Sequence, residues 1–289
     1  MRCNGAVALG AIALWLGIGV DAIRAAPAES ERDFDKVTIP LIEPGKLDKS
    51  DTAVTGYLFR PSGNGPFPAV VILHGCNGLD WHQASQAGWR LLKGYAERYA
   101  RHGYVALVLD SFEPRGISNA CGKPLTVSAA RRSWDAFSAA RFLGQLGNVD
   151  AQRIVLQGDS HGGWTTLVAL ERGRWTGPSP FVAGIAWYPS CYAANGFAAP
   201  LLILIGEQDD WTPAASCRRM TERLRREQTG AEIVLKTFSG ATHAYDFPLP
   251  PRTNFLGHNM AFDAKATEAS WQAIDTFLGK YAAAPMPQR

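Results

Sequence analysis

The chain has 289 residues, of which 46% are hydrophobic and 19% are charged, a balance typical of a globular protein with one large core. Its formal net charge of +3 is too small for the basic surface expected of a nucleic-acid-binding protein. The basic run at 218–226 is interrupted by Glu222 and is typical of the solvated face of a helix. We therefore expect no nucleic-acid partner.

The first 28 residues have the pattern of a secretory signal peptide. Arg2 precedes an uncharged run at 5–20, and small residues ending in an A-x-A pattern follow at 26–28. The run is shorter than the roughly 20 residues of a membrane-spanning helix, so we expect no stable membrane insertion. Cleavage after Ala28 would leave a mature chain of 29–289 with a net charge of +2, exported to the periplasm or secreted. The alternative is an uncleaved N-terminal anchor.

Four cysteines remain once Cys3 leaves with the signal peptide, and their even number in an exported chain predicts disulfides. Cys76, Cys121, Cys191 and Cys217 allow three pairings. They form no C-x-x-C motif and no cluster with histidine at zinc spacing, so we expect no metal site.

Short aliphatic runs alternate with segments of helical spacing along the rest of the chain. From 69 onward the runs are continuously apolar, as in strands buried on both faces of a parallel sheet. The run at 54–59 precedes a Gly/Pro turn and is interpreted as an antiparallel edge strand. The pattern predicts one α/β domain at 29–289, with a mostly parallel, doubly wound sheet of about eight strands flanked by helices. Strands are expected at 54–59, 69–73, 105–110, 154–157, 184–188, 201–205 and 233–238, and helices at 84–102, 128–146, 163–171, 214–228 and 262–281.

The stretch LQGDSHGGW at 156–164 fits two serine-hydrolase motifs. A chymotrypsin-like protease needs an all-β fold and a serine followed directly by two glycines, whereas here His161 intervenes and a strand runs into a helix. The stretch instead matches G-x-S-x-G, the strand-to-helix elbow of α/β-hydrolases, which makes Ser160 the expected nucleophile. The N–H of His161, at the start of the helix, is the expected first donor to an oxyanion.

A serine nucleophile needs a base and an acid, which in this fold follow it in the order Asp or Glu, then His. Asp209 lies 49 residues after Ser160 in the loop after the strand at 201–205, and His243 lies 34 residues further, after the strand at 233–238. Both loops leave the carboxyl edge of the sheet, where Ser160 also lies. Asp210 is a rival for Asp209, although we expect it to cap the helix that follows Pro213.

The second oxyanion donor is expected in the loop LHGCNGLDW at 73–81, which follows the third strand. The N–H of Cys76 is the favoured donor. His74 is interpreted as a structural residue that holds this loop by hydrogen bonds.

Taken together, these residues resemble the dienelactone hydrolase family of α/β-hydrolases, in its secreted or periplasmic branch. The similar motifs are VILHGCNGL (71–79), LDSFEPRG (109–116), GDSHGG (158–163), YPSCY (188–192), GEQDDWTP (206–213) and GATHAYDF (240–247). The resemblance implies a triad of Ser160, Asp209 and His243 and no cofactor. Founding members of the family have a cysteine nucleophile and a glutamate in the loop after the third strand. Because this sequence has Ser160 and no such glutamate, serine-esterase chemistry is expected.

The placement of the elements that this resemblance implies also predicts how the cysteines pair. Cys76 and Cys121 follow strands that are neighbours in the fold, and Cys191 and Cys217 follow the next adjacent pair. The expected disulfides are therefore 76–121 and 191–217, and the first would fix the loop of Cys76 against the loop at 111–122.

Several side chains are candidates for substrate binding because they lie near loops at the same edge. An apolar acyl or lactone pocket is one interpretation of these aromatic residues, and ordinary core packing is the alternative. Arg115 could bind a substrate carboxylate or could cap its own loop. The aromatic candidates are Phe112, Trp164, Trp187, Tyr188, Trp211 and Tyr245.

These observations predict a serine hydrolase that cleaves small-molecule carboxylic esters or lactones through an acyl-enzyme on Ser160. We expect a monomer or homodimer. One alternative is a peptidase or amidase of the prolyl-oligopeptidase type, which shares G-x-S-x-G-G. The other is a non-catalytic binding protein with this fold.

Overall fold

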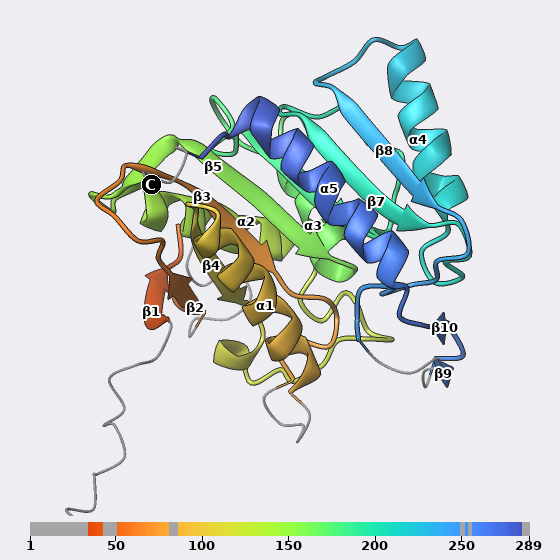
Figure 1. Ribbon diagram of the computed structural model, residues 1–289, viewed down its shortest axis with the longest axis horizontal. Coiled ribbons are helices and arrows are strands. Elements are labelled where there is room, and N and C mark those ends of the chain that lie inside the picture. The colour runs from red at the N-terminus through yellow and green to blue at the C-terminus, as the bar shows by residue number, and fades with distance from the viewer. Residues whose placement is uncertain (1–33, 43–50, 81–85, 249–251, 254–255, 285–289) are drawn as a thin grey trace, which may run out of the picture. The chain divides into compact units, whose positions relative to one another are not determined.

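Eight strands form one sheet in the order β1-β2-β4-β3-β5-β6-β7-β8 in the computed structural model (Figure 1). The structure describes residues 34–42, 51–80, 86–248, 252–253 and 256–284, so the predicted signal peptide at 1–28 lies outside the described residues. The strands from β3 to β8 are parallel, whereas β2 is antiparallel to both β1 and β4. The strands are β1 (Asp35–Pro40), β2 (Ala53–Phe59), β3 (Phe67–Leu73), β4 (Val105–Asp110), β5 (Val149–Asp159), β6 (Ala183–Trp187), β7 (Leu201–Gly206) and β8 (Ile233–Phe238).

Helices cover both faces of the sheet, as the doubly wound prediction requires. Figure 1 shows α1 and α5 over one face, and α2 and α3 over the other. Tyr95 of α1 and Trp271 of α5 contact edge to face at 5.0 Å, and α4 packs against β7 and β8. The helices are α1 (Ala87–Arg101), α2 (Ala129–Gly144), α3 (His161–Leu170), α4 (Ala214–Arg226) and α5 (Ala264–Tyr281), with a 3-10 turn, η1, at Glu113–Arg115.

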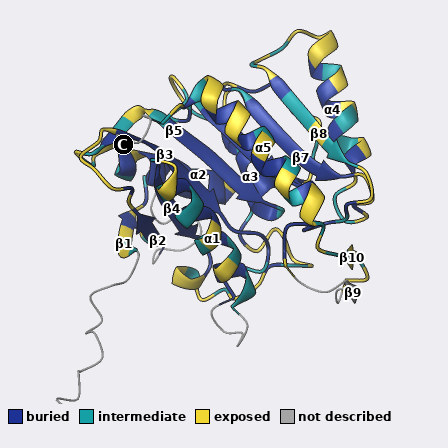
Figure 2. Ribbon diagram, viewed as in Figure 1, coloured by how far each residue is buried: buried dark blue, intermediate teal, exposed yellow. Residues whose placement is uncertain are grey.

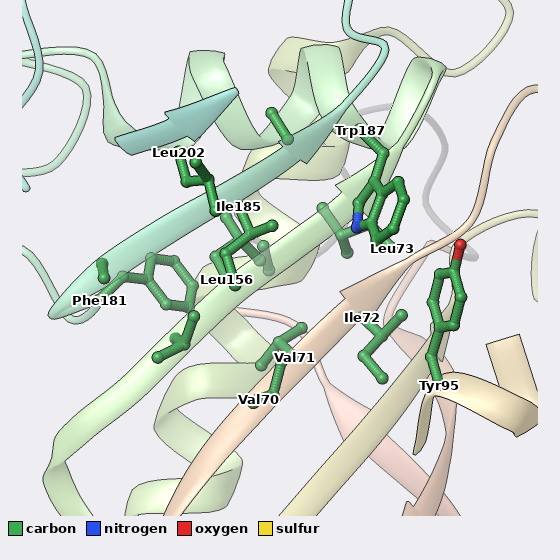
Figure 3. Close-up of a cluster of buried hydrophobic side chains, with 14 of the residues drawn as sticks. Val70, Val71, Ile72, Leu73, Tyr95, Leu156, Phe181, Ile185, Trp187 and Leu202 are labelled. Atoms are coloured by element: carbon green, nitrogen blue, oxygen red, sulfur yellow. The ribbon is translucent and has the colours of Figure 1, made fainter. Parts of the chain in front are cut away.

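The core lies along the central strands. Every residue of β3, β4, β6 and β7 is buried, which explains the continuous apolar runs of these segments (Figure 2). Figure 3 shows Val71, Leu156, Ile185 and Leu202, from four neighbouring strands, packed along the centre of the sheet. Burial on both faces fixes the register of these strands, and with it the positions of the loops at their carboxyl ends.

Two features differ from the expected fold. The segment at 54–59 is antiparallel as predicted, but it is not an edge strand, because β1 pairs with its free side. The β1 segment, DKVTIP, is short and mostly exposed, and no strand was predicted there. A short hairpin of β9 (Arg252–Thr253) and β10 (Asn259–Met260) was also not predicted. Among the described residues, no helix is both long enough and apolar enough to cross a membrane.

Candidate active site

Ser160 occupies a sharp turn between the end of β5 and the start of α3. Its φ of 50° and ψ of −111° are uncommon for a non-glycine residue. A Cβ at Gly158 would overlap the backbone of Gly162, so the turn requires glycine there. The Ser160 N–H donates to the Trp187 carbonyl at 2.9 Å, which ties the turn to the end of β6. The strained turn and its glycines agree with the predicted elbow.

The structure brings Ser160, His243 and Asp209 together in the predicted order. His243 Nε2 lies 3.0 Å from Ser160 Oγ, and His243 Nδ1 lies 2.8 Å from Asp209 Oδ2. A carboxylate only accepts hydrogen bonds, so the imidazole proton is on Nδ1 and the lone pair of Nε2 faces the serine hydroxyl. His243 and Asp209 are 2% and 4% exposed. This tautomer is the one that can remove a proton from Ser160.

Asp209 is held in place by three further donors. Its Oδ1 accepts the N–H groups of Trp211 at 3.0 Å and Thr212 at 2.7 Å, and the Thr212 hydroxyl lies 2.8 Å from Oδ2. Asp210 instead lies beside His258, at 3.2 Å, and Asn259. The expectation that Asp210 caps α4 is wrong, because Pro213 occupies the N-cap position and no side chain caps this helix.

The loop after β3 lies against the start of α3. His74 is fully buried, and its Nε2 accepts the Ser111 N–H at 3.2 Å while Nδ1–H donates to the Gly75 carbonyl at 2.7 Å. Burial holds the pKa of His74 well below its usual value, so the ring is neutral. Its contacts match the predicted structural role.

Both candidate oxyanion donors have N–H groups without an acceptor among the described residues. His161 is the first residue of α3, where a helix has no internal acceptor, and Cys76 lies in the loop after β3. An N–H group in such a position can donate to a ligand.

Two disulfides connect Cys76 with Cys121 and Cys191 with Cys217, so both predicted pairings are confirmed. The Cα atoms are 4.8 Å and 5.0 Å apart. The Ala120 N–H also donates to the Cys76 carbonyl at 2.7 Å. Two disulfides indicate folding in an oxidising environment.

The disulfide at Cys76 should affect turnover, whereas the second should affect stability alone. Replacing Cys76 and Cys121 with alanine frees the loop of a candidate oxyanion donor, so we expect kcat to fall by about 10-fold, less than the full loss of one donor. The Cys191→Ala/Cys217→Ala variant is the matched control, and each pair should lower the free energy of unfolding by about 2–4 kcal/mol. Ester kinetics and thermal unfolding measure both effects. Equal kcat values for the two double variants would contradict a role of the first disulfide in the site.

Two of the six aromatic candidates are partly exposed beside the site, whereas the other four, which include Phe112 and Trp187, are buried in the protein. The partly exposed Trp211 lies 4.9 Å from the His243 ring, and Trp164 contacts the ring of His161 edge to face at 5.5 Å. Tyr188 and Tyr245 are fully buried, and their hydroxyls bond to Asp246 and Ser270. The prediction that Tyr188 and Tyr245 line the pocket is therefore corrected. Tyr188 packs against His243 from inside the protein, at 4.8 Å.

The contacts of Arg115 favour a structural role, since it bonds within its own loop at Ser111 and also to Asp51 and Asp135 in two other segments. Its side chain is 7% exposed, and its guanidinium bonds to Asp51, to Asp135 and to the Ser111 carbonyl. A guanidinium bonded in this way has no free pair of N–H donors for a substrate carboxylate.

The sequence profile of the dienelactone hydrolase family matches residues 54–282, which include Ser160, Asp209 and His243. The chain belongs to the dienelactone hydrolase family. Membership confirms the expected family and the expected class of enzyme, a hydrolase of carboxylic esters.

Two curated proteins and two solved structures show what this member of the dienelactone hydrolase family is similar to. A Bradyrhizobium protein named as a 2-oxo-3-(5-oxofuran-2-ylidene)propanoate lactonase is 26% identical over 65% of this chain and 77% of its own. A Methylorubrum extorquens protein named as a carboxymethylenebutenolidase is 24% identical over 83% and 81%. A Klebsiella pneumoniae structure named as a dienelactone hydrolase has a TM-score of 0.66 at 18% identity, covering 86% of this chain and all of that one. Thermogutta terrifontis esterase 2 has a TM-score of 0.61 at 18% identity, covering 86% and 94%.

Sequence reasoning interpreted Asp246 as a hydrogen-bonding residue of its loop, but it did not predict that Asp246 and Asp159 are buried beside the site. Asp159 and Asp246 are 4% exposed, and burial raises the pKa of each carboxyl to about 7. The Asp246 Oδ1 accepts the Tyr188 hydroxyl at 2.7 Å, whereas its Oδ2 has no partner among the described residues. Within the described part of the chain, no three His, Cys, Asp or Glu side chains gather as a metal site would require.

Asp246→Asn should change how stability depends on pH. The folded-state pKa of Asp246 is about 7, above the value of 3.8 for an ordinary aspartate, so the unfolded chain releases this proton first as pH rises. The free energy of unfolding is therefore highest below pH 4, where Asp246 is protonated in both states, and it falls between about pH 4 and 7. Asparagine does not ionise, so the free energy of unfolding of the variant lacks this decrease. At pH 8 it should exceed the wild-type value by up to about 4 kcal/mol. Melting temperatures at pH 5 and 8 measure this, and an unchanged difference between the proteins would contradict it.

Proposed function

We propose that the chain hydrolyses small-molecule carboxylic esters, lactones included, through an acyl-enzyme on Ser160. The observation that carries the proposal is the continuous relay from Ser160 Oγ to His243 Nε2 at 3.0 Å and from His243 Nδ1 to Asp209 at 2.8 Å. A hydroxyl in such a relay can lose its proton as it attacks a carbonyl carbon.

In the first half of the reaction, His243 Nε2 takes the Ser160 proton while Oγ bonds to the substrate carbonyl carbon. The negative charge that forms on the carbonyl oxygen is stabilised by the N–H groups of Cys76 and His161. His243, charged at this point, is stabilised by Asp209, and it then gives its proton to the departing alkoxide. The products are a free alcohol and an acyl group on Ser160. In a lactone both remain on one molecule.

In the second half, water replaces the alcohol. His243 removes a proton from a water molecule, which attacks the acyl carbon, and the same two N–H groups stabilise the second oxyanion. Collapse of this intermediate breaks the bond to Ser160 Oγ, which regains a proton from His243. A carboxylic acid leaves, and the site returns to its starting state.

Three similar proteins support this chemistry. Thermogutta terrifontis esterase 2, which shares the fold, has been captured phosphorylated by paraoxon and in complexes with propionate and butyrate. Relatives named as lactonase and carboxymethylenebutenolidase support lactones as substrates. Short acyl esters and lactones are therefore the first substrates to test.

A panel of p-nitrophenyl esters with increasing acyl length, assayed beside lactones and peptide p-nitroanilides, tests the proposed function. We expect the highest kcat/KM on an ester or a lactone. Faster cleavage of the anilides would favour a peptidase instead. Binding of every compound without turnover would favour the non-catalytic alternative.

A further inference from the structure

Arg132 connects the two segments that carry the candidate oxyanion donors. Its side chain, from the first turn of α2, is fully buried. Nη2 donates to the His74 carbonyl at 2.7 Å, and Nη1 lies 2.6 Å from His161 Nδ1. A guanidinium only donates, so His161 accepts at Nδ1 and its Nε2–H donates to the Pro124 carbonyl at 2.9 Å. Arg132 thereby fixes the loop before Cys76 and the first residue of α3.

The charge of Arg132 has no direct counter-ion. Among the described residues, no carboxylate lies within ion-pair distance of it, whereas the adjacent Arg131 pairs with Asp51 at 2.8 Å. Its Nε has no hydrogen-bond partner in the same part of the chain. Burial lowers the pKa of Arg132 to about 10, against the opposing effect of the nearby carboxyl groups of Asp135, Asp159 and Asp110, and the side chain is still charged at neutral pH. A buried cation without a paired carboxylate is strongly destabilising, and such groups concentrate at functional sites.

The two segments also touch directly. A Cβ at Gly162 would lie 2.7 Å from the His74 carbonyl oxygen, so the loop and the start of α3 are packed backbone to backbone. Arg132 binds that same carbonyl from the α2 side. Movement of this guanidinium would therefore shift the loop and the helix start relative to each other. Misplaced donors stabilise an oxyanion less well.

We propose that Arg132 is a positioning residue for oxyanion stabilisation. It holds the N–H groups of Cys76 and His161 in a fixed position relative to each other, and its charge adds positive potential where the oxyanion forms. This inference rests on the proposed function, since it concerns the charge that forms during ester hydrolysis. An unpaired cation in a low-dielectric interior stabilises a developing negative charge more than a neutral substrate. Its contribution should therefore appear in turnover rather than in substrate binding.

Arg132→Met tests the assignment, because methionine keeps part of the aliphatic stem and removes the charge and both hydrogen bonds. Arg131→Met is the matched control, since Arg131 is the next residue, is 5% exposed and is also a cation. We would measure kcat and KM on a short-chain p-nitrophenyl ester, and the inhibition constant of a trifluoromethyl ketone, which forms a tetrahedral alkoxide on serine. Thermal unfolding confirms that each variant is folded at the assay temperature.

For Arg132→Met we expect kcat to fall by about 10- to 100-fold with KM within about 3-fold, and the ketone to bind more weakly by the same factor as kcat falls. Arg132→Lys keeps the charge but cannot bridge both partners, so it should lie between Arg132→Met and wild type. If Arg132→Met fails to fold, the Arg132→Lys variant is used for the same measurements.

Two outcomes separate this assignment from the proposed function. If the wild-type protein does not hydrolyse esters or lactones, the proposed function fails. If it does, and the Arg132 variants lose no more kcat and no more ketone affinity than Arg131→Met, only the role of Arg132 is overturned. Parallel changes in KM and kcat would also reject it, since they indicate a general disturbance of the site.

Discussion

Replacing Ser160 with alanine will lower kcat for ester hydrolysis by about 10⁵- to 10⁶-fold, because it removes the hydroxyl that forms the acyl-enzyme. The hydroxyl lies 3.0 Å from His243 Nε2, and its loss leaves the remaining donors able to bind substrate but not to attack it. KM should change little. Single-turnover and steady-state assays on the best ester measure the effect.

The Ser160→Ala variant should remain folded. Ser179→Ala is a suitable control, because Ser179 precedes β6 and lies at the opposite edge of the sheet from the elbow. Its kcat should equal that of wild type. If Ser160→Ala kept activity within about 10-fold of wild type, hydrolysis would not use a serine nucleophile at this position.

Asp209→Asn should lower kcat by about 10⁴-fold, the second-largest effect we expect. An amide at 209 can present its NH₂ to His243 Nδ1, which then loses the proton that keeps Nε2 free to act as a base. The side chain keeps its shape, and the Trp211 and Thr212 N–H groups still have an acceptor. The fold should therefore survive, so that the loss reflects the tautomer of His243. Stopped assays at high enzyme concentration measure the residual rate.

Asp210→Asn is the matched control for this experiment. Asp210 is the neighbouring residue and lies beside His258 and Asn259, so its substitution should leave kcat within about 3-fold of wild type, as for an ordinary surface change. A larger loss for Asp210→Asn than for Asp209→Asn would reverse the assignment of the acid.

The mostly parallel, doubly wound sheet could be predicted because several of its strands are continuously apolar. The runs at 69–73 and 201–205 match β3 and β7 closely, since only burial on both faces selects such sequences. Once the strands were placed, the elbow and the loops of Asp209 and His243 followed at one edge. The disulfide pairs followed as well, from the family resemblance.

Contacts that depend on side-chain direction could not be predicted. The helix predicted at 128–146 contains the stretch SAARRSWDAF, in which the charged residues Arg131, Arg132 and Asp135 are all buried. Tyr188 and Tyr245 lie near the right loops but point into the core, where their hydroxyls find partners. The strand β1 was missed because it is short, buries one residue and depends on its pairing with β2. Local sequence does not specify which long polar side chain turns inward.

Labelling with a fluorophosphonate probe, followed by peptide mass mapping, tests the central claim most directly. The relay between Ser160, His243 and Asp209 predicts one adduct per chain, on the peptide that contains Ser160, and no adduct in the Ser160→Ala variant. Folded protein that hydrolyses esters but takes up no label at Ser160, or a variant that labels as well as wild type, would contradict the account.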